Sequence, residues 1–321
     1  MILEPKGVSM NLPTENRSTS ARWGGAMARR SAPSVGIPEV VDANVIGLCQ
    51  LRCWFCWGPE HDRGAASIDE WKCLLERLAA DGCKRVVYTG GEPLLFPDIG
   101  RLLSLGKRLG IENTLSTNGI LLRQRAEVLD NVDQVGIPID GSDQNAAESM
   151  RPRITSQGGW IAAIEAMRLV QRRQALALII RTVVSRTNAP DVLAIPYRLL
   201  EHGVKLDGDK VMLKLYMVSR RGPIARRIRE HSWNEHLAIA HQEFEALADQ
   251  IRFDHPQLRV VTQTSETLPG RYFLVDPLGN ASDGELGGDT FGNVFTDYDA
   301  VMEAYRMRRA TMGTAQPDSR R

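Results

Sequence analysis

Long apolar runs and a strong excess of one charge are both missing from this sequence. No stretch approaches about 18 consecutive apolar residues, and the N-terminus lacks the charged start and apolar run of a signal peptide. The 40 Lys and Arg residues nearly balance the 39 Asp and Glu residues, which disfavours a general nucleic-acid coat. We therefore expect a cytoplasmic protein that neither crosses a membrane nor binds nucleic acid.

Cysteine is scarce, and its odd count of five does not suit a disulfide framework. Cys49, Cys53 and Cys56 lie within one stretch of eight residues, which in a reducing compartment favours metal binding. Cys73 and Cys83 are expected at the other end of the fold, and the sequence beyond residue 220 has no cysteine. The thiols thus suffice for one metal centre and leave none for a second.

Short apolar runs alternate with amphipathic segments along most of the chain. The expected strands are 40–48, 84–89, 111–117, 132–139, 176–184 and 211–218. The helices expected after them lie near 68–80, 98–109, 121–130, 158–174 and 190–202. Further helices near 232–253 and 297–309, and strands at 258–264 and 271–277, complete the pattern. Because parallel strands need a helical crossover, the alternation predicts a parallel sheet with right-handed connections.

This pattern and the length of 321 residues predict an α/β fold, a partial (β/α)6 TIM-like barrel with a small C-terminal α/β cap. The predicted parts are a flexible leader at 1–37, the barrel at 38–220, a cap and substrate-side extension at 221–310, and a flexible tail at 311–321.

The three clustered cysteines follow the first expected strand with the spacing C-x3-C-x2-C. Zinc normally takes four ligands, and neither a fourth cysteine nor a well-spaced histidine follows. An iron–sulfur cube held by three thiolates leaves one iron open for chemistry. Three inert cysteines that happen to lie close together are the alternative interpretation.

Gly90, Gly91, Glu92 and Pro93 follow the second expected strand. Two glycines let the backbone pass close to a ligand, and proline fixes the turn. On its own such a segment is an ordinary turn.

The cysteine motif together with this GGEP segment resembles the radical S-adenosylmethionine (SAM) superfamily, over roughly residues 40–220. The resemblance implies a 4Fe–4S cluster on Cys49, Cys53 and Cys56, whose open iron binds SAM. It implies a 5′-deoxyadenosyl radical that takes a hydrogen atom from a substrate. It also implies that residues 90–93 meet the amino group of SAM, with backbone carbonyls and Glu92 as acceptors.

Short polar side chains follow the third and fourth expected strands, at the end of the barrel where barrel enzymes keep their chemistry. By resemblance, Ser116 and Asn118 are candidates for the ribose and methionine parts of SAM. Asp140 and Ser142 stay open between SAM and substrate, and Arg151 is a candidate for the SAM carboxylate. Capped turns are the alternative for both segments.

Two strands carry a charge in an otherwise apolar run. Since a buried charge is unfavourable unless paired, Arg181 should face the barrel interior and an anion, with an internal salt bridge as the alternative. Lys214 raises the same question, and Tyr272 lies in a short segment similar to viperin-like enzymes, as a candidate substrate or hydrogen-transfer contact. A basic run after the expected strand at 211–218 is either a solvated face or an anion site; it comprises Arg220, Arg221, Arg226, Arg227 and Arg229.

One cluster and several arginines favour a small anionic substrate over a peptide. A weaker resemblance to nucleoside-antibiotic and sugar-modifying members favours decarboxylation of a nucleoside uronic acid of the cytosylglucuronate type. The alternatives are a viperin-like nucleotide dehydratase, a sugar dehydrogenase or epimerase, a peptide-modifying enzyme, and a non-catalytic iron–sulfur sensor. Nothing in the sequence marks a flavin site, so we expect flavodoxin or ferredoxin to supply electrons by docking near Arg52 and Arg63.

Overall fold

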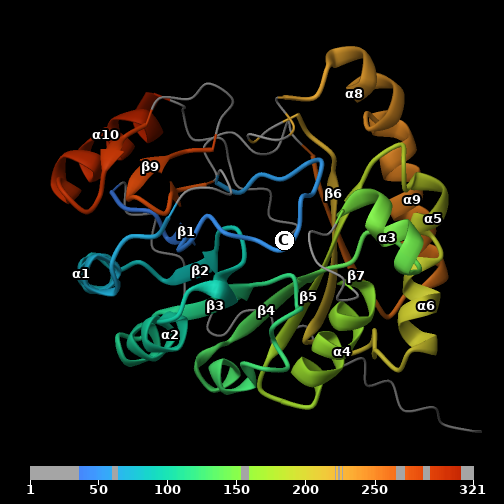
Figure 1. Cartoon of the computed structure of the whole chain (residues 1–321), viewed down its shortest axis with the longest axis horizontal. Coiled ribbons are helices and arrows are strands. Elements are labelled where there is room, and N and C mark those ends of the chain that lie inside the picture. The colour runs from blue at the N-terminus through green and yellow to red at the C-terminus, as the bar shows by residue number, and fades with distance from the viewer. Residues whose placement is uncertain are drawn as a thin grey trace, which may run out of the picture.

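The computed structural model describes residues 36–59, 64–152, 159–220, 222, 225, 227–264, 272–284 and 290–311. Within them, seven parallel strands pair in chain order and form most of one curved sheet (Figure 1). These strands are β1 (Val40–Asn44), β2 (Arg85–Thr89), β3 (Glu112–Ser116), β4 (Gln134–Pro138), β5 (Ala177–Val184), β6 (Val211–Met217) and β7 (Arg259–Gln263). This architecture confirms the partial TIM-like barrel predicted from the sequence.

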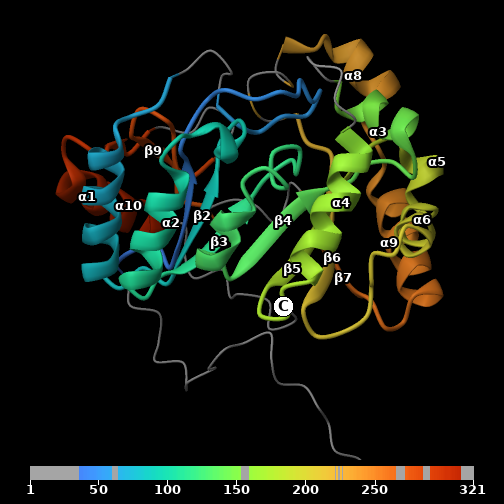
Figure 2. The ribbon, with the colours of Figure 1, turned by 60° about the horizontal axis from the view of Figure 1, so that its bottom comes forward.

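Helices cover the outer face of the sheet (Figures 1 and 2). The longer ones are α1 (Ile68–Ala80), α2 (Ile99–Arg108), α4 (Gly159–Gln171), α9 (His241–Asp254) and α10 (Tyr298–Thr311). The shorter ones are η1 (Pro93–Leu95), η2 (Ala126–Asn131), α3 (Gln144–Met150), α5 (Ala189–Val192), α6 (Ile195–Glu201) and α8 (Glu230–His236). Helix α1 begins at a capping box formed by Ser67 and Glu70, and it buries one stripe of apolar side chains against the sheet.

Three expected helices differ from the structure. The segment near 121–130 forms turns and then η2, and the side chain of Arg125 there donates to the carbonyls of Leu94 and Phe96. The helix expected near 190–202 divides into α5 and α6, because Pro196 lies in the first turn of α6 and has no N–H to continue a preceding helix. The helix expected near 232–253 divides into α8 and α9, and α3 was not predicted.

The chain beyond residue 220 extends the sheet at both edges. Strand β7 adds to β6 in parallel, and β8 (Leu274–Val275) adds to β1. Strands β9 (Asn280–Ser282) and β10 (Gly292–Asn293) follow β8 antiparallel. The cap therefore shares its sheet with the barrel, and the domain boundary at 220 stays a prediction.

Burial alternates along β1, β2 and most of β6. Residues such as Val41 and Ala43 of β1 are buried against helices, whereas the residues between them face the inside of the curve and keep some accessible surface. On this inner face Arg85 pairs with Glu112 at 2.7 Å, and Gln134 donates to the same carboxylate. The inner face is thus polar, which is uncommon for a space that serves packing alone.

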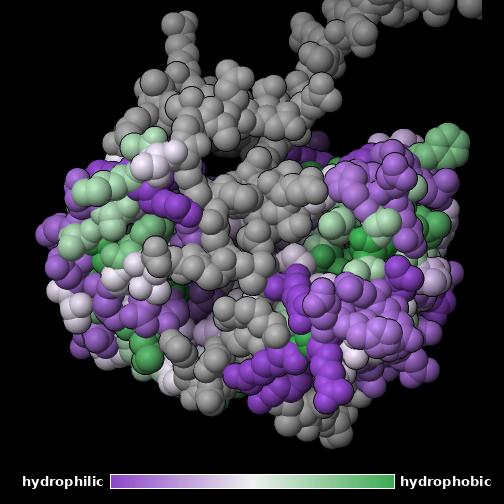
Figure 3. All heavy atoms as spheres, turned by 90° about the horizontal axis from the view of Figure 1, so that it is seen from above, coloured by the Kyte–Doolittle hydropathy of each residue, from purple (hydrophilic) through white to green (hydrophobic). Residues whose placement is uncertain are grey.

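None of the described helices is long and apolar enough to cross a bilayer. Seen from above, hydrophilic side chains dominate the described surface, and apolar ones form separate patches (Figure 3).

Candidate active site

The parallel strands bring several loops to one end of the barrel, which we call the rim. The cysteine loop (residues 45–58) follows β1, residues 90–93 follow β2, residues 117–119 follow β3 and residues 140–143 follow β4. Their meeting is a consequence of strand direction, as was expected from the sequence.

The three thiols of the cysteine loop are close enough to affect one another. Burial, followed by smaller effects that include the charge of Cys53, raises the pKa of Cys49 to about 11. Burial and then Cys53 raise the pKa of Cys56 to about 12, and burial raises that of Cys53, which is 6% exposed. Without a metal these thiols are protonated at neutral pH, and a cationic iron centre would displace their protons.

Across the described part of the chain, no three His, Cys, Asp or Glu side chains meet at a point where they could hold a single metal ion. A cubane cluster takes one thiolate on each iron, so its ligands do not converge on one atom. One buried and two partly buried thiols on one loop, each affected by its neighbours, are a donor set that fits such a cluster.

Gly90 and Gly91 pack directly against the cysteine loop. The Gly91 and Glu92 amides donate to the carbonyls of Ile46 and Leu48, each at 2.7 Å. A Cβ on Gly90, whose φ is +133°, would lie 2.4 Å from the Ile46 oxygen, and one on Gly91 would lie 2.1 Å from that of Leu48. The two glycines are therefore needed for contact with the loop itself, whatever ligand binds there.

Glu92 is fully buried and bonded within the chain. Its carboxylate accepts from the Leu94 amide at 3.1 Å, the Thr117 hydroxyl at 2.6 Å and the Asn118 amide at 2.8 Å. Burial raises its pKa to about 7 although these donors lower it. Glu92 thus ties the end of β2 to the end of β3, and Pro93 beside it opens η1. The contact of Glu92 with the SAM ammonium stays a prediction.

Asn118 and Arg151 reach two thiols of the cysteine loop. The Asn118 side-chain amide donates to Cys49 Sγ at 3.9 Å and to Gln50 at 3.1 Å. The Arg151 guanidinium donates to Cys53 Sγ at 3.4 Å and lies 4.9 Å from the centre of the Phe55 ring. Both residues were chosen from the sequence for SAM, and the structure brings both to the cysteine loop.

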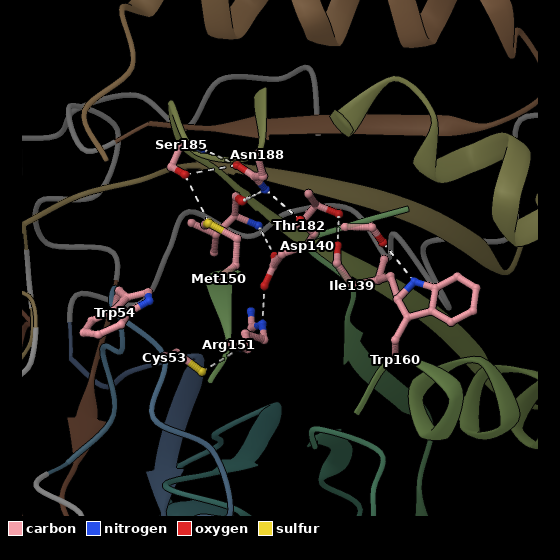
Figure 4. A network of polar contacts seen from close by, with 12 residues as sticks. Cys53, Trp54, Ile139, Asp140, Met150, Arg151, Trp160, Thr182, Ser185 and Asn188 are labelled. Atoms are coloured by element: carbon pink, nitrogen blue, oxygen red, sulfur yellow. Dashed lines mark hydrogen bonds and ion pairs between the residues drawn. The ribbon is translucent and has the colours of Figure 1, made fainter. Parts of the chain in front are cut away.

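Arg151 is held by an ion pair with the fully buried Asp140 (Figure 4). Asp140 is 0% exposed, accepts from the Arg151 Nε and from the Val183 amide at 2.7 Å, and its backbone carbonyl accepts from Asn188 at 2.9 Å. Burial raises the pKa of Asp140 and the charge of Arg151 opposes this rise. Figure 4 shows Arg151 between Asp140 and Cys53, so the pair joins β4 and β5 to the cysteine loop.

The end of α3 also holds the cysteine loop. The indole N–H of Trp54 donates to the Ser149 carbonyl at 3.0 Å, and the Arg52 amide donates to the Pro152 carbonyl at 2.8 Å. The side chain of Arg52 donates to the carbonyls of Cys49 and Leu51. The loop is therefore held by contacts with residues 90–92 and with the end of α3.

Ser142 is turned away from this group. Its amide and hydroxyl both donate to the carboxylate of Asp191 in α5, which lies 49 positions further along the chain. A partner so distant in sequence gives no local signal. The role of Ser142 at SAM or substrate stays a prediction.

Arg181, Lys214 and Ser116 lie together on the inner face. Arg181 donates to the Ser116 hydroxyl, and Lys214 is its register partner on β6. A Cβ on Gly136 would lie 2.4 Å from the Arg181 Cζ, so this glycine leaves the space that the guanidinium fills. Tyr272 accepts from Gln263 at 2.6 Å near the same group.

Asp42 is the charged residue of this face that the sequence analysis missed. Its pKa is raised to about 6 by burial, against the lowering effect of Arg181 and Lys214. A carboxylate in the middle of an apolar strand, two positions before Asn44, was the available signal, since residues two apart in a strand share a face.

The basic run after β6 is only partly described. Arg220 donates to the Ile228 carbonyl at 2.6 Å, Arg227 is exposed, and Arg229 precedes α8. Arg221 and Arg226, like Arg63, lie outside the described residues.

Comparison with known proteins shows which family this site resembles. Residues 43–184 match the family described as the Radical SAM superfamily. The chain is 33% identical over 170 residues to the PqqA peptide cyclase of Gluconobacter oxydans, covering 50% of this chain and 47% of that protein. It is 24% identical over 250 residues to an S-adenosylmethionine-dependent nucleotide dehydratase of Lacinutrix mariniflava, covering 74% of this chain and 49% of that protein. The chain thus spans about half the length of these relatives.

Solved structures share the fold. Streptococcus suis SuiB has a TM-score of 0.65 at 15% identity, over 84% of this chain and 66% of that chain. The enzyme anSMEcpe, solved with bound AdoMet and Cp18Cys peptide, has a TM-score of 0.61 at 16% identity, over 82% of this chain and 79% of that chain.

Proposed function

We propose that this chain, whose residues 43–184 match the Radical SAM superfamily, uses a 4Fe–4S cluster and SAM as cofactors and takes a hydrogen atom from a small anionic substrate bound on the inner face of the barrel. The observation that carries this proposal is that Arg181 and Lys214 face the interior side by side, and neither forms an ion pair with a described residue. Two unpaired cations in a partly buried space favour an anionic ligand.

A bound cluster and SAM would supply the radical chemistry that removes a hydrogen atom from a substrate. The chain's own residues hold and order the centre. Cys49, Cys53 and Cys56 are the proposed ligands, and Asn118 and Arg151 donate to two of their sulfur atoms. The inner-face cations then orient the anionic group of the substrate below the rim.

The finer proposal is decarboxylation of a nucleoside uronic acid of the cytosylglucuronate type. A carboxylate on a sugar ring suits Arg181, which can donate two parallel hydrogen bonds, and Lys214 beside it. The overall change is loss of carbon dioxide with hydrogen in its place.

A nucleotide dehydratase is the second candidate. Its support is the similarity to the Lacinutrix mariniflava nucleotide dehydratase, which extends over 74% of this chain. The phosphate groups of the nucleotide would then bind Arg181, Lys214 and arginines of the run after β6. The peptide-related names among the similar proteins make a peptide the third substrate class to test.

The test is incubation of the reduced, reconstituted protein and SAM with cytosylglucuronate, with CTP and with a peptide, separately. Loss of carbon dioxide from the first, by mass spectrometry, supports the decarboxylase proposal. Loss of water from CTP supports the dehydratase, and a changed peptide with no reaction of the small anions overturns the proposal of a small substrate.

Electron supply by flavodoxin or ferredoxin is also part of the proposal. The cysteine loop presents two exposed apolar side chains, Leu48 at 50% and Trp54 at 45% exposure, with the cationic Arg52 nearby in the sequence. Apolar contacts beside a positive charge suit an acidic redox protein.

A further inference from the structure

Two layers of the inner face differ in how their charges are matched. In the layer nearer the start of the strands, Arg85 and Glu112 form an ion pair at 2.7 Å. In the next charged layer, Asp42, Arg181 and Lys214 influence one another, but within the described residues no two of them come within ion-pair distance. This layer holds two cations and one carboxylate that have no ion-pair partner among the described residues.

The position of Asp42 separates it from the two cations across the interior. Strand β1 pairs with β2 and β8, whereas Arg181 and Lys214 belong to β5 and β6, on the other side of the curved sheet. Burial and then the nearby Tyr216 and Asp42 raise the pKa of Tyr272, which places Tyr272 near the same carboxylate. The side chain of Asp42 keeps accessible surface and forms no hydrogen bond with the described residues. Asp42 and the two cations therefore belong to different parts of the same inner face, and no ion pair joins them among the described residues.

We propose that Asp42 is a specificity-determining residue that accepts a hydrogen bond from an N–H group of the substrate whose anionic group binds Arg181 and Lys214. This inference rests on the proposed function, since it assumes that a small anion binds on the inner face. Two cations and one carboxylate match a ligand with one net negative charge and a separate N–H donor. An aminopyrimidine joined to a sugar carboxylate has this set of groups, whereas a nucleoside triphosphate carries several further negative charges.

Selectivity between cytosine and uracil tests this role, because the two bases differ in the group that would contact the Asp42 carboxylate. Cytosine presents an amino group that donates, and uracil presents a carbonyl oxygen that a carboxylate repels. Asparagine has nearly the shape of aspartate, and its side-chain amide can accept a hydrogen bond from the cytosine amino group or donate one to the uracil carbonyl. The variant Asp42→Asn should therefore change selectivity while leaving the fold and the anion contacts in place.

The experiment is calorimetric binding of cytosylglucuronate and its uracil counterpart to the reconstituted protein with SAM, unreduced and free of oxygen. We expect the wild type to bind the cytosine compound about tenfold or more tightly than the uracil compound. Asp42→Asn should reduce that ratio to about twofold or less, and Lys214→Met should weaken both compounds alike. Asp69→Asn, an exposed change on α1, is the matched control and should keep the wild-type ratio.

Equal binding of both compounds by the wild type, or a ratio unchanged in Asp42→Asn, would overturn the role of Asp42 and leave the small-anion proposal standing. Failure of both compounds to bind, with no effect of Lys214→Met, would overturn the small-anion proposal itself. Thermal unfolding of each variant confirms that folded protein is compared.

Discussion

Replacement of Arg151 by methionine should destabilise the fold strongly, because it leaves the carboxylate of Asp140 buried without its charge partner. Asp140 is 0% exposed, and the Val183 amide would be its remaining side-chain donor among the described contacts. Removing one partner of a buried ion pair costs about 3–5 kcal/mol. Methionine keeps much of the apolar length of arginine, so the loss of the charge dominates.

The size of the effect should depend on pH and on Asp140. Without Arg151, the pKa of the buried Asp140 rises further above its value in the unfolded chain. A raised folded-state pKa means that the added loss is full at pH 8 and declines as the pH falls toward the unfolded value. Adding Asp140→Asn to Arg151→Met should recover about 1–3 kcal/mol, since no buried charge is then left.

Urea unfolding of the metal-free protein, followed by circular dichroism, measures these effects without a contribution from the cluster. Arg101→Met is the control, because Arg101 forms only a surface pair with Asp98 at 2.8 Å. That change should cost less than about 1 kcal/mol. A cost of Arg151→Met no larger than the control, or equal at pH 5 and pH 8, would refute the reasoning.

Three further predictions concern the inner face and the rim. Asp42→Asn should stabilise the metal-free protein by about 1–2 kcal/mol at pH 8 and not at pH 4, because the raised pKa of Asp42 makes its ionisation unfavourable in the folded state. The charged and titratable groups near Asp42 are Arg181, Lys214 and Tyr272. Urea unfolding that finds the variant less stable at pH 8 would contradict this. Gly136→Ala should displace Arg181 and weaken cytosylglucuronate binding about tenfold or more in calorimetry. Gly100→Ala, whose Cβ would lie 4.0 Å from Val128, is the control and should leave this affinity unchanged. Equal affinity in both variants would exclude Arg181 from the site. Arg52→Glu should slow reduction of the reconstituted protein by flavodoxin about tenfold at low salt. Arg172→Glu, which lies before β5, is the control. Stopped-flow rates that depend neither on salt nor on Arg52 would show that the electron donor docks elsewhere.

The barrel could be predicted well because its signals are local. Helix α1 was expected at 68–80 and is found at Ile68–Ala80, since the capping box at Ser67 and the apolar spacing lie within one short segment. The break between α5 and α6 had a local signal in Pro196, whereas the break before α9 depends on how each short helix packs, which the apolar pattern alone does not show. The cysteine and GGEP motifs likewise indicated the family, because the spacing of the ligands is local.

The internal bonds of the site could not be predicted, because they join residues far apart in the chain. Nothing near Glu92 indicates that Thr117 and Asn118 donate to it, and nothing near Ser142 indicates Asp191. The sequence shows that Arg181 is a charged residue within an apolar strand, but the position of its guanidinium beside Gly136 depends on strand register. Register and side-chain direction are set by the assembled sheet.

Release of 5′-deoxyadenosine from SAM by the reduced, reconstituted protein tests the central claim most directly. The wild type and Cys73→Ala, which changes an exposed cysteine on α1, should both release it. Cys49→Ala, Cys53→Ala and Cys56→Ala should each release none, because each removes a proposed ligand of the cluster. Release that persists in the Cys53→Ala variant, or none from the wild type with a strong reductant and a range of small anions, would contradict the account.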